Sequence, residues 1–178
     1  MYRGATEDNE CPIVVDTSTP SCGSSRFGCW TCTLVNEDKS MTAMIQNDVD
    51  KDWMKPLLEF RNNLDFRGDE ARIRERKKRD FQRLGGHLTH YHDKDGDFQL
   101  VPGPYKQSAR SELLQSLLEA QIKIQNNPNT PDIAKNIELI TKDELKEIRR
   151  IWLTEKHEIE DVLPDIYKNT IGTDYQDS

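Results

Sequence analysis

Four cysteines near the start of this 178-residue chain are the residues whose type and spacing are best suited to chemistry. Cys11, Cys22, Cys29 and Cys32 fall within 22 residues, and the last three form a C-x6-C-x2-C array. A tight turn can bring the two sulfurs of a C-x-x-C pair to one metal centre, and Gly28 gives the backbone freedom for that turn. Four thiolates are a complete ligand set for a tetrahedral zinc ion or a [4Fe–4S] cluster.

The spacing of these cysteines favours an iron–sulfur cluster over zinc. Zinc sites commonly use two C-x-x-C pairs, whereas this chain has one such pair and two widely spaced partners. Phe27 and Trp30, which neighbour the thiolates, are of a type that shields a cluster from water, although both also fit ordinary core positions. Two disulfides, or free buried thiols, are the alternatives to a metal.

A second candidate site is a cationic segment in an otherwise acidic chain. The net charge is −7, yet residues 67–83 hold eight basic side chains against four acidic ones. Arg72, Arg74, Arg76 and Arg79 are therefore candidates for sequence-independent contacts with DNA phosphates. The alternative is a solvated helix face on which Glu75 and Arg79 form an i,i+4 ion pair.

Two further clusters, one of histidines and one of acidic residues, are less suited to binding a metal. The segment from His87 to His92 alternates in strand fashion, which places only His90 and His92 on one face, and no nearby cysteine completes a ligand set. We therefore expect surface residues of a hairpin rather than a second metal site. The acidic run that begins at Asp93 differs from a calcium-binding loop. Its glycine is misplaced at Gly96, and Pro104 stands where the bidentate glutamate belongs.

The elements that must position these residues are mostly helical. We expect an irregular, cysteine-rich, cluster-binding loop over residues 1–36 and a mainly α domain over residues 37–178. Ser40 is predicted to cap a first helix, and apolar side chains at spacings of three and four continue from Trp53 to Leu64. Arg61 shares that stripe.

The second half of the domain has clearer boundaries. Residues 111–125 form an amphipathic pattern with a leucine stripe, and Thr141 and Glu144 make a capping box before the next helix. A small β-hairpin is predicted near residues 87–101, with its turn at residues 93–96. Pro102-Gly103-Pro104 then predicts an extended connection.

The cysteine-containing residues 10–23 and 25–33 resemble the DndC family of DNA phosphorothioation sulfurtransferases. Residues 102–105 (Pro-Gly-Pro-Tyr), 117–121 (Leu-Leu-Glu-Ala-Gln) and 147–157 resemble the same family, so the likeness covers nearly the whole chain. The resemblance implies a [4Fe–4S] protein that uses ATP and passes sulfur from a cysteine desulfurase to the DNA backbone. It carries over Cys22, Cys29 and Cys32 as ligands, with the fourth either Cys11 or a group from another part of the protein.

The same family has an N-terminal α/β nucleotide-binding domain with a Ser-Gly-Gly-x-Asp-Ser loop, which this sequence lacks. Its adjacent glycines, Gly85 and Gly86, are followed by His-Leu-Thr and do not open a phosphate-binding helix. We therefore expect the C-terminal portion of such a protein: a fragment, a split gene product or a late-start gene call. ATP would act only through the missing domain, and the chain alone would be inactive.

Composition bounds the remaining possibilities. Hydrophobic residues make up 34% of the chain and charged residues 32%, which predicts one modest core. There is neither a leader-like start nor an apolar run of the roughly 20 residues that cross a bilayer, so we expect a cytoplasmic protein in a reducing compartment. The competing hypothesis is a non-enzymatic, zinc-binding interaction module.

Overall fold

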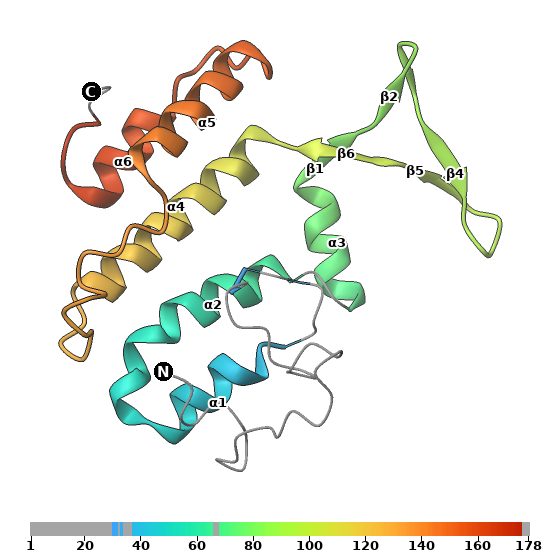
Figure 1. Ribbon diagram of the computed structural model, residues 1–178. Helices are drawn as coiled ribbons and strands as arrows, with labels where there is room; N and C mark the ends of the chain where they lie inside the picture. The colour runs from blue at the N-terminus through green and yellow to red at the C-terminus, as the bar shows by residue number, and fades with distance from the viewer. Residues whose placement is uncertain (1–29, 32, 34–36, 66–67, 176–178) are drawn as a thin grey trace, which may run out of the picture. The chain divides into compact units, whose positions relative to one another are not determined.

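The computed structural model describes residues 30–31, 33, 37–65 and 68–175, and these are mainly helical, as the sequence predicts (Figure 1). The α-helices are α1 (Lys39–Asn47), α2 (Lys55–Leu64), α3 (Asp69–Lys77), α4 (Gln107–Gln125), α5 (Lys142–Thr154) and α6 (Leu163–Ile171). A 3-10 helix, η1 (Val49–Met54), joins α1 to α2. None of the helices in these ranges is both long enough and apolar enough to cross a membrane.

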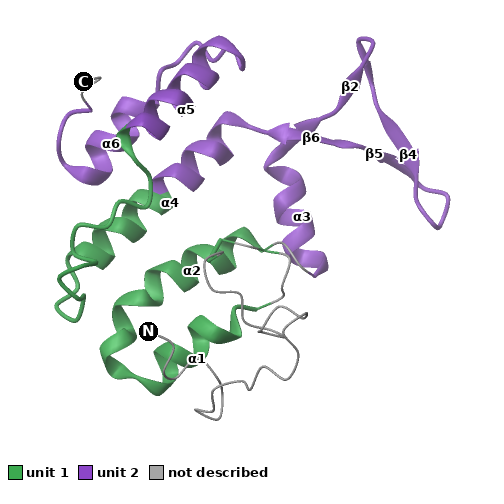
Figure 2. Cartoon of the chain, viewed as in Figure 1, with its two compact units in different colours: residues 1–65, 116–142 green, residues 66–115, 143–178 purple. Residues whose placement is uncertain are grey.

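The chain divides into two compact units (Figure 2). Unit 1 comprises residues 1–65 and 116–142, and unit 2 comprises residues 66–115 and 143–178. Helix α4 contributes residues 107–115 to unit 2 and residues 116–125 to unit 1. Helix α4 therefore belongs partly to each unit.

The N-cap of helix α1 lies two residues before the predicted one. The Oδ1 atom of Asp38 accepts a hydrogen bond from the backbone N–H of Met41 at 2.9 Å, so Asp38 is the N-cap. The prediction of Ser40 as the cap is wrong, because Ser40 lies inside the helix and is buried. The helix that begins after Asp38 places Met41 and Met44 in the buried cluster of unit 1.

The core of unit 1 joins α1, α2 and the end of α4. Met41, Met44, Leu57 and Ile124 form its buried cluster, and partly buried side chains that include Trp53 pack against it. The predicted apolar stripe from Trp53 to Leu64 is present, but it runs through η1 before α2 begins. Arg61 in this stripe is only 1% exposed, and its Nη1 atom lies 3.7 Å from Oδ2 of Asp65.

The segment after α4 folds back onto the helix that precedes it. Thr130 donates through Oγ1 to the carbonyl oxygen of Ile124 at 2.6 Å. Gln125 donates to the carbonyl oxygen of Ile137 at 3.0 Å, and Gln121 accepts from the N–H of Leu139 at 2.8 Å. These bonds satisfy polar groups at the helix end and hold Ile137 and Leu139 against the unit 1 core.

Unit 2 is held together by buried side chains and by ion pairs between residues far apart in the sequence. Leu145, Trp152 and Leu163 are buried, and α5 begins directly after Thr141, as the capping pattern predicts. Arg149 donates from Nε and Nη2 to Oδ2 of Asp161, at 2.9 and 2.6 Å. Arg110 of α4 forms an ion pair with Glu158 and lies 5.8 Å from the ring of Trp152.

Six short strands of unit 2 form a three-branched β arm (Figure 1). The strands are β1 (Arg79–Phe81), β2 (Arg83–Leu84), β3 (His87–Leu88), β4 (His90–His92), β5 (Phe98–Leu100) and β6 (Pro102–Tyr105). Strands β1 and β6 pair as a stem, while β2 with β3 and β4 with β5 form two hairpins. The predicted hairpin near residues 87–101 corresponds to β4 and β5, but the strand expected over residues 87–92 divides at Thr89.

The three branches meet in a closed ring of backbone hydrogen bonds. Gln82 N–H donates to the carbonyl oxygen of Val101 at 3.0 Å, Val101 N–H to that of Thr89 at 2.9 Å, and Thr89 N–H to that of Gln82 at 2.9 Å. Each residue gives one bond and accepts one. The junction therefore satisfies its own backbone without a larger sheet.

Close packing at the stem requires glycine at position 103. A Cβ atom on Gly103 would lie 2.7 Å from the carbonyl carbon of Phe81 and 2.9 Å from the nitrogen of Gln82. Both contacts are with backbone, which cannot turn away as a side chain can. The extended Pro-Gly-Pro connection predicted from the sequence is in fact strand β6, and its glycine allows β1 to approach.

We predict that Gly103→Ala opens the stem at a cost of about 1–3 kcal/mol, the usual range for overpacking. Amide hydrogen exchange at Gln82, Thr89 and Val101 should accelerate. Gly85→Asn is the control, because a Cβ there meets nothing within 4 Å and asparagine tolerates its φ of 57°. Unchanged exchange in Gly103→Ala would contradict the assigned contact.

Candidate functional site

The four predicted metal ligands, Cys11, Cys22, Cys29 and Cys32, lie outside the described residues, as does Phe27. Trp30, which stands between Cys29 and Cys32 in the sequence, is described and half-buried. Its ring lies 5.6 Å from the ring of Phe60, centroid to centroid, with the two planes tilted by 50°. The cysteine array thus contains one aromatic side chain that is docked on the helical core of unit 1.

Trp30 and Phe60 link the array to the first core of the protein. Phe60 projects from α2 and is buried, while Trp30 also packs against the cluster that contains Met41 and Ile124. An aromatic pair of this geometry contributes about 0.5–1.5 kcal/mol beyond the burial of its area. Of the two roles considered for Trp30, the described contacts are those of a core aromatic. Phe60 was recognised in the sequence as part of an apolar stripe, but not as the partner of Trp30.

The four arginines proposed for DNA contact separate into two pairs. Arg72 and Arg74 lie on α3 with exposed side chains. Arg76 and Arg79 are half-buried and are engaged with the β arm. The segment that looks uniformly cationic in the sequence therefore has two physical roles.

Arg76 and Arg79 fasten α3 to the arm through aromatic rings. The guanidinium carbon of Arg76 lies 4.5 Å from the ring centroid of Phe81, and that of Arg79 lies 3.9 Å from the ring centroid of Tyr105. Each cation–π contact of this kind stabilises by about 0.5–1 kcal/mol, or more when it is desolvated. Arg79 also donates to the carbonyl oxygen of Gly103 at 3.2 Å.

Glu75 completes this contact. It forms the predicted i,i+4 ion pair with Arg79 and accepts a hydrogen bond from the Tyr105 hydroxyl at 3.1 Å. Burial, followed by the hydrogen bond to Glu75, raises the pKa of Tyr105. Burial lowers the pKa of Arg79, but the bond to Glu75 and the other charged contacts outweigh it, so the pKa is raised overall. The ion pair is real, but Arg79 lies in β1 rather than on a solvated helix face.

The three histidines are exposed on the hairpins, as expected. His90 stacks on Phe98 with centroids 4.7 Å apart, and His92 meets the same ring edge-on at 6.4 Å. Within the described ranges, no three histidine, cysteine or acidic side chains converge as metal ligands do. His90 therefore covers one face of the exposed Phe98, and His92 packs beside the same ring.

The acidic turn between β4 and β5 is organised by one carboxylate. Asp93 accepts hydrogen bonds from the N–H groups of Asp95 at 3.1 Å and Asp97 at 2.9 Å, and from the side-chain amide of Gln99 at 3.1 Å. The bond from Asp97, with the smaller contributions of Gln99 and Asp95, holds the pKa of Asp93 below its ordinary value. The carboxylate stabilises a turn, in keeping with the rejection of a calcium loop.

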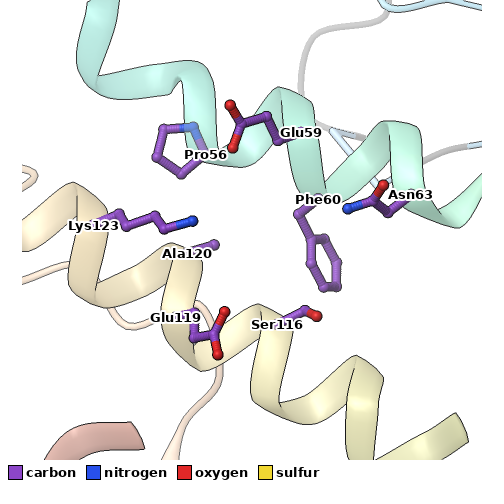
Figure 3. Close-up of a pocket in the computed structure, with 8 residues that line it drawn as sticks. All are labelled: Pro56, Glu59, Phe60, Asn63, Ser116, Glu119, Ala120 and Lys123. Atoms are coloured by element: carbon purple, nitrogen blue, oxygen red, sulfur yellow. The ribbon is translucent and has the colours of Figure 1, made fainter.

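A small open pocket lies between α2 and α4 within unit 1 (Figure 3). Its volume is about 80 Å³, and its lining residues are Pro56, Glu59, Phe60, Asn63, Ser116, Glu119, Ala120 and Lys123. Figure 3 shows the Phe60 ring pointing from α2 towards Ser116 of α4. Ligand sites generally measure about 300–1,000 Å³, so this pocket is too small for a nucleotide.

Comparisons of this chain with protein-family models, with curated proteins and with solved structures give no match. The functional argument therefore depends on the residues themselves.

We predict that Trp30→Ala lowers the stability of unit 1 by about 2 kcal/mol, the scale for losing a half-buried aromatic side chain. Guanidinium unfolding followed by circular dichroism would measure the change. Trp30→Phe, which keeps a ring against Phe60, should recover at least half of the loss. An unfolding midpoint for Trp30→Ala equal to that of the wild type would show that the docking contributes nothing.

The order of the β4–β5 turn should depend on the ionisation of Asp93. Because folding lowers the pKa of Asp93, its contribution is present above the ordinary pKa of an aspartate and is lost as the pH falls through the lower folded-state pKa. Amide shifts and exchange of Asp95 and Asp97 would report the loss. Asp93→Asn, which does not titrate, should abolish this pH dependence; a variant with the wild-type profile would refute the assignment.

Proposed function

We propose that this chain is the iron–sulfur-binding C-terminal portion of a cytoplasmic sulfurtransferase that takes part in phosphorothioate modification of the DNA backbone. The observation that carries the proposal is the array of four cysteines within 22 residues, together with the family resemblance of the segments that contain it. The docking of Trp30 on the unit 1 core supports it, because a cluster-binding segment needs attachment to a folded scaffold.

The donor set fits the cofactor in its chemistry. Thiolate sulfur is the preferred ligand of [4Fe–4S] clusters, and Cys22, Cys29 and Cys32 would hold the cluster, with Cys11 as the proposed fourth ligand. Such a cluster, when bound, supplies a redox-active centre. The described part of the chain contributes the indole of Trp30, which packs against Phe60 and the unit 1 core and so attaches this part of the array to the helices.

The remaining partners in this proposal act outside the chain. ATP would be bound by a nucleotide-binding domain of the kind that the family has at its N-terminus. A cysteine desulfurase would deliver the sulfur, and DNA would accept it. The chain by itself would therefore bind the cluster and DNA without completing the transfer.

The second candidate function is a non-enzymatic, zinc-binding interaction module. Four thiolates also satisfy tetrahedral zinc, and several large apolar side chains of the β arm are exposed, among them Leu84 and Phe98. Both hypotheses place a metal in the array, so the identity of the metal separates them.

Anaerobic purification followed by iron, sulfide and zinc analysis tests the proposal. We expect a coloured protein with a sulfide-to-iron charge-transfer band and close to four irons per chain. Cys22→Ser, Cys29→Ser and Cys32→Ser should each lose most of the iron, whereas Thr31→Ser, inside the same array, should retain it. A colourless protein with one zinc ion per chain would refute the cluster and establish the interaction module.

A further inference from the structure

The two hairpins of the β arm have opposite chemistry. The turn of the β4–β5 hairpin holds Asp93, Asp95 and Asp97, whereas residues 81–92, which include β2, β3 and β4, contain no acidic side chain in a chain with 32 of them. The β2–β3 hairpin instead carries Arg83 and His87, both exposed. A polyanion would meet an attractive surface at one hairpin and a repulsive one at the other.

The β2–β3 hairpin is also narrow and apolar at its end. Gly85 and Gly86 have φ values of 57° and 83°, which are the two positive φ angles of a type I′ turn, so no side chain widens the tip. Leu84 is 75% exposed and pairs across the strands with His87, while Leu88 pairs with Arg83. Because paired residues point to the same face, each face of the hairpin presents one leucine beside one basic group.

Helix α3 adds cations at a fixed position relative to this arm. Arg76 and Arg79 hold the helix to the stem, while Arg72 and Arg74, four and two residues before Arg76 on α3, remain exposed. Counting about 1.5 Å per helical residue and about 3.3 Å per strand residue, the chain from Arg74 to Leu84 spans at most roughly 25–30 Å. That length falls within one turn of duplex DNA, about 34 Å.

We propose that the β2–β3 hairpin enters the major groove of duplex DNA while Arg72 and Arg74 contact the flanking phosphates. The major groove is about 12 Å wide and accepts a two-stranded ribbon. Leu84 would make apolar contact with base edges, and Arg83 would neutralise phosphate or donate to a base. The inference takes DNA as the ligand from the proposed function, but it identifies the binding elements from the structure alone.

A protein partner fits this surface less well. The centre of a protein interface is depleted of charge, whereas here Leu88 has the charged Arg83 directly across the strand. The absence of carboxylates over residues 81–92 complements a polyanion in particular.

Fluorescence anisotropy with the full chain and a labelled random-sequence duplex tests the inference across about 50–200 mM salt. Arg72→Gln, Arg74→Gln and Arg83→Gln should each weaken binding several-fold and reduce the slope of log K against log salt by about 0.9, since each removes one phosphate contact. Leu84→Ser should weaken binding by about tenfold with the slope unchanged, because an apolar contact releases no counterion.

Two matched variants serve as controls. Lys94→Gln removes a cation from the acidic turn of the other hairpin, and Ile159→Ser removes a 99% exposed apolar side chain elsewhere in unit 2. Both should bind DNA as the wild type does. If Arg83→Gln and Leu84→Ser bind like these controls, or if Leu84→Ser changes only self-association, the hairpin is not a DNA-binding element.

Iron content measured on the same samples separates this inference from the proposed function. If the protein contains iron but binds duplex DNA independently of the hairpin, the inference is overturned and the proposed function is not. If protein purified without iron binds DNA through the hairpin, the inference is supported and the proposed iron–sulfur cluster is refuted.

Discussion

The contact between helix α3 and the β arm is the interaction on which the rest of unit 2 depends. Arg76 stacks on Phe81 and Arg79 on Tyr105, and Glu75 joins the second pair through an ion pair and a hydrogen bond. The arm consists only of two-stranded pairs, which are marginal in water without further packing. The cationic side chains of α3 supply part of that packing, because arginine covers an aromatic face while its charge stays partly hydrated.

This contact also explains how one basic segment divides its functions. Arg76 and Arg79 use their charge in contacts with the β arm and are not available to bind a ligand. They instead fix the position of α3, which carries the exposed Arg72 and Arg74. The side chains of Arg72 and Arg74 on α3 are exposed to water. Arg83 lies beyond the junction of Gln82, Thr89 and Val101. The ring of backbone bonds at that junction lets two short hairpins diverge with opposite charge, which a single continuous hairpin would not allow.

Unit 1 has a different organisation, in which the cysteine-rich segment meets a helical core. Trp30 packs against the cluster of Met41, Met44, Leu57 and Ile124 and also contacts the ring of Phe60. Among the buried polar groups of this unit, Thr130 and Gln121 are bonded to nearby backbone, and Arg61 lies beside the carboxylate of Asp65. Burial of Arg61 would be costly without such a neighbour.

The sequence by itself determined the mainly helical class, the helix at residues 111–125, the start of α5 after Thr141 and the hairpin turn at Asp93, because periodicity, capping and turn chemistry are local. Tertiary structure decided that Asp38 rather than Ser40 caps α1, that the strand expected over residues 87–92 breaks at Thr89, and that Gly103 permits close approach of β1. It also decided which arginines are engaged and which are exposed. These outcomes depend on side chains and backbone that meet from distant parts of the chain, and spacing along one segment carries no information about such partners.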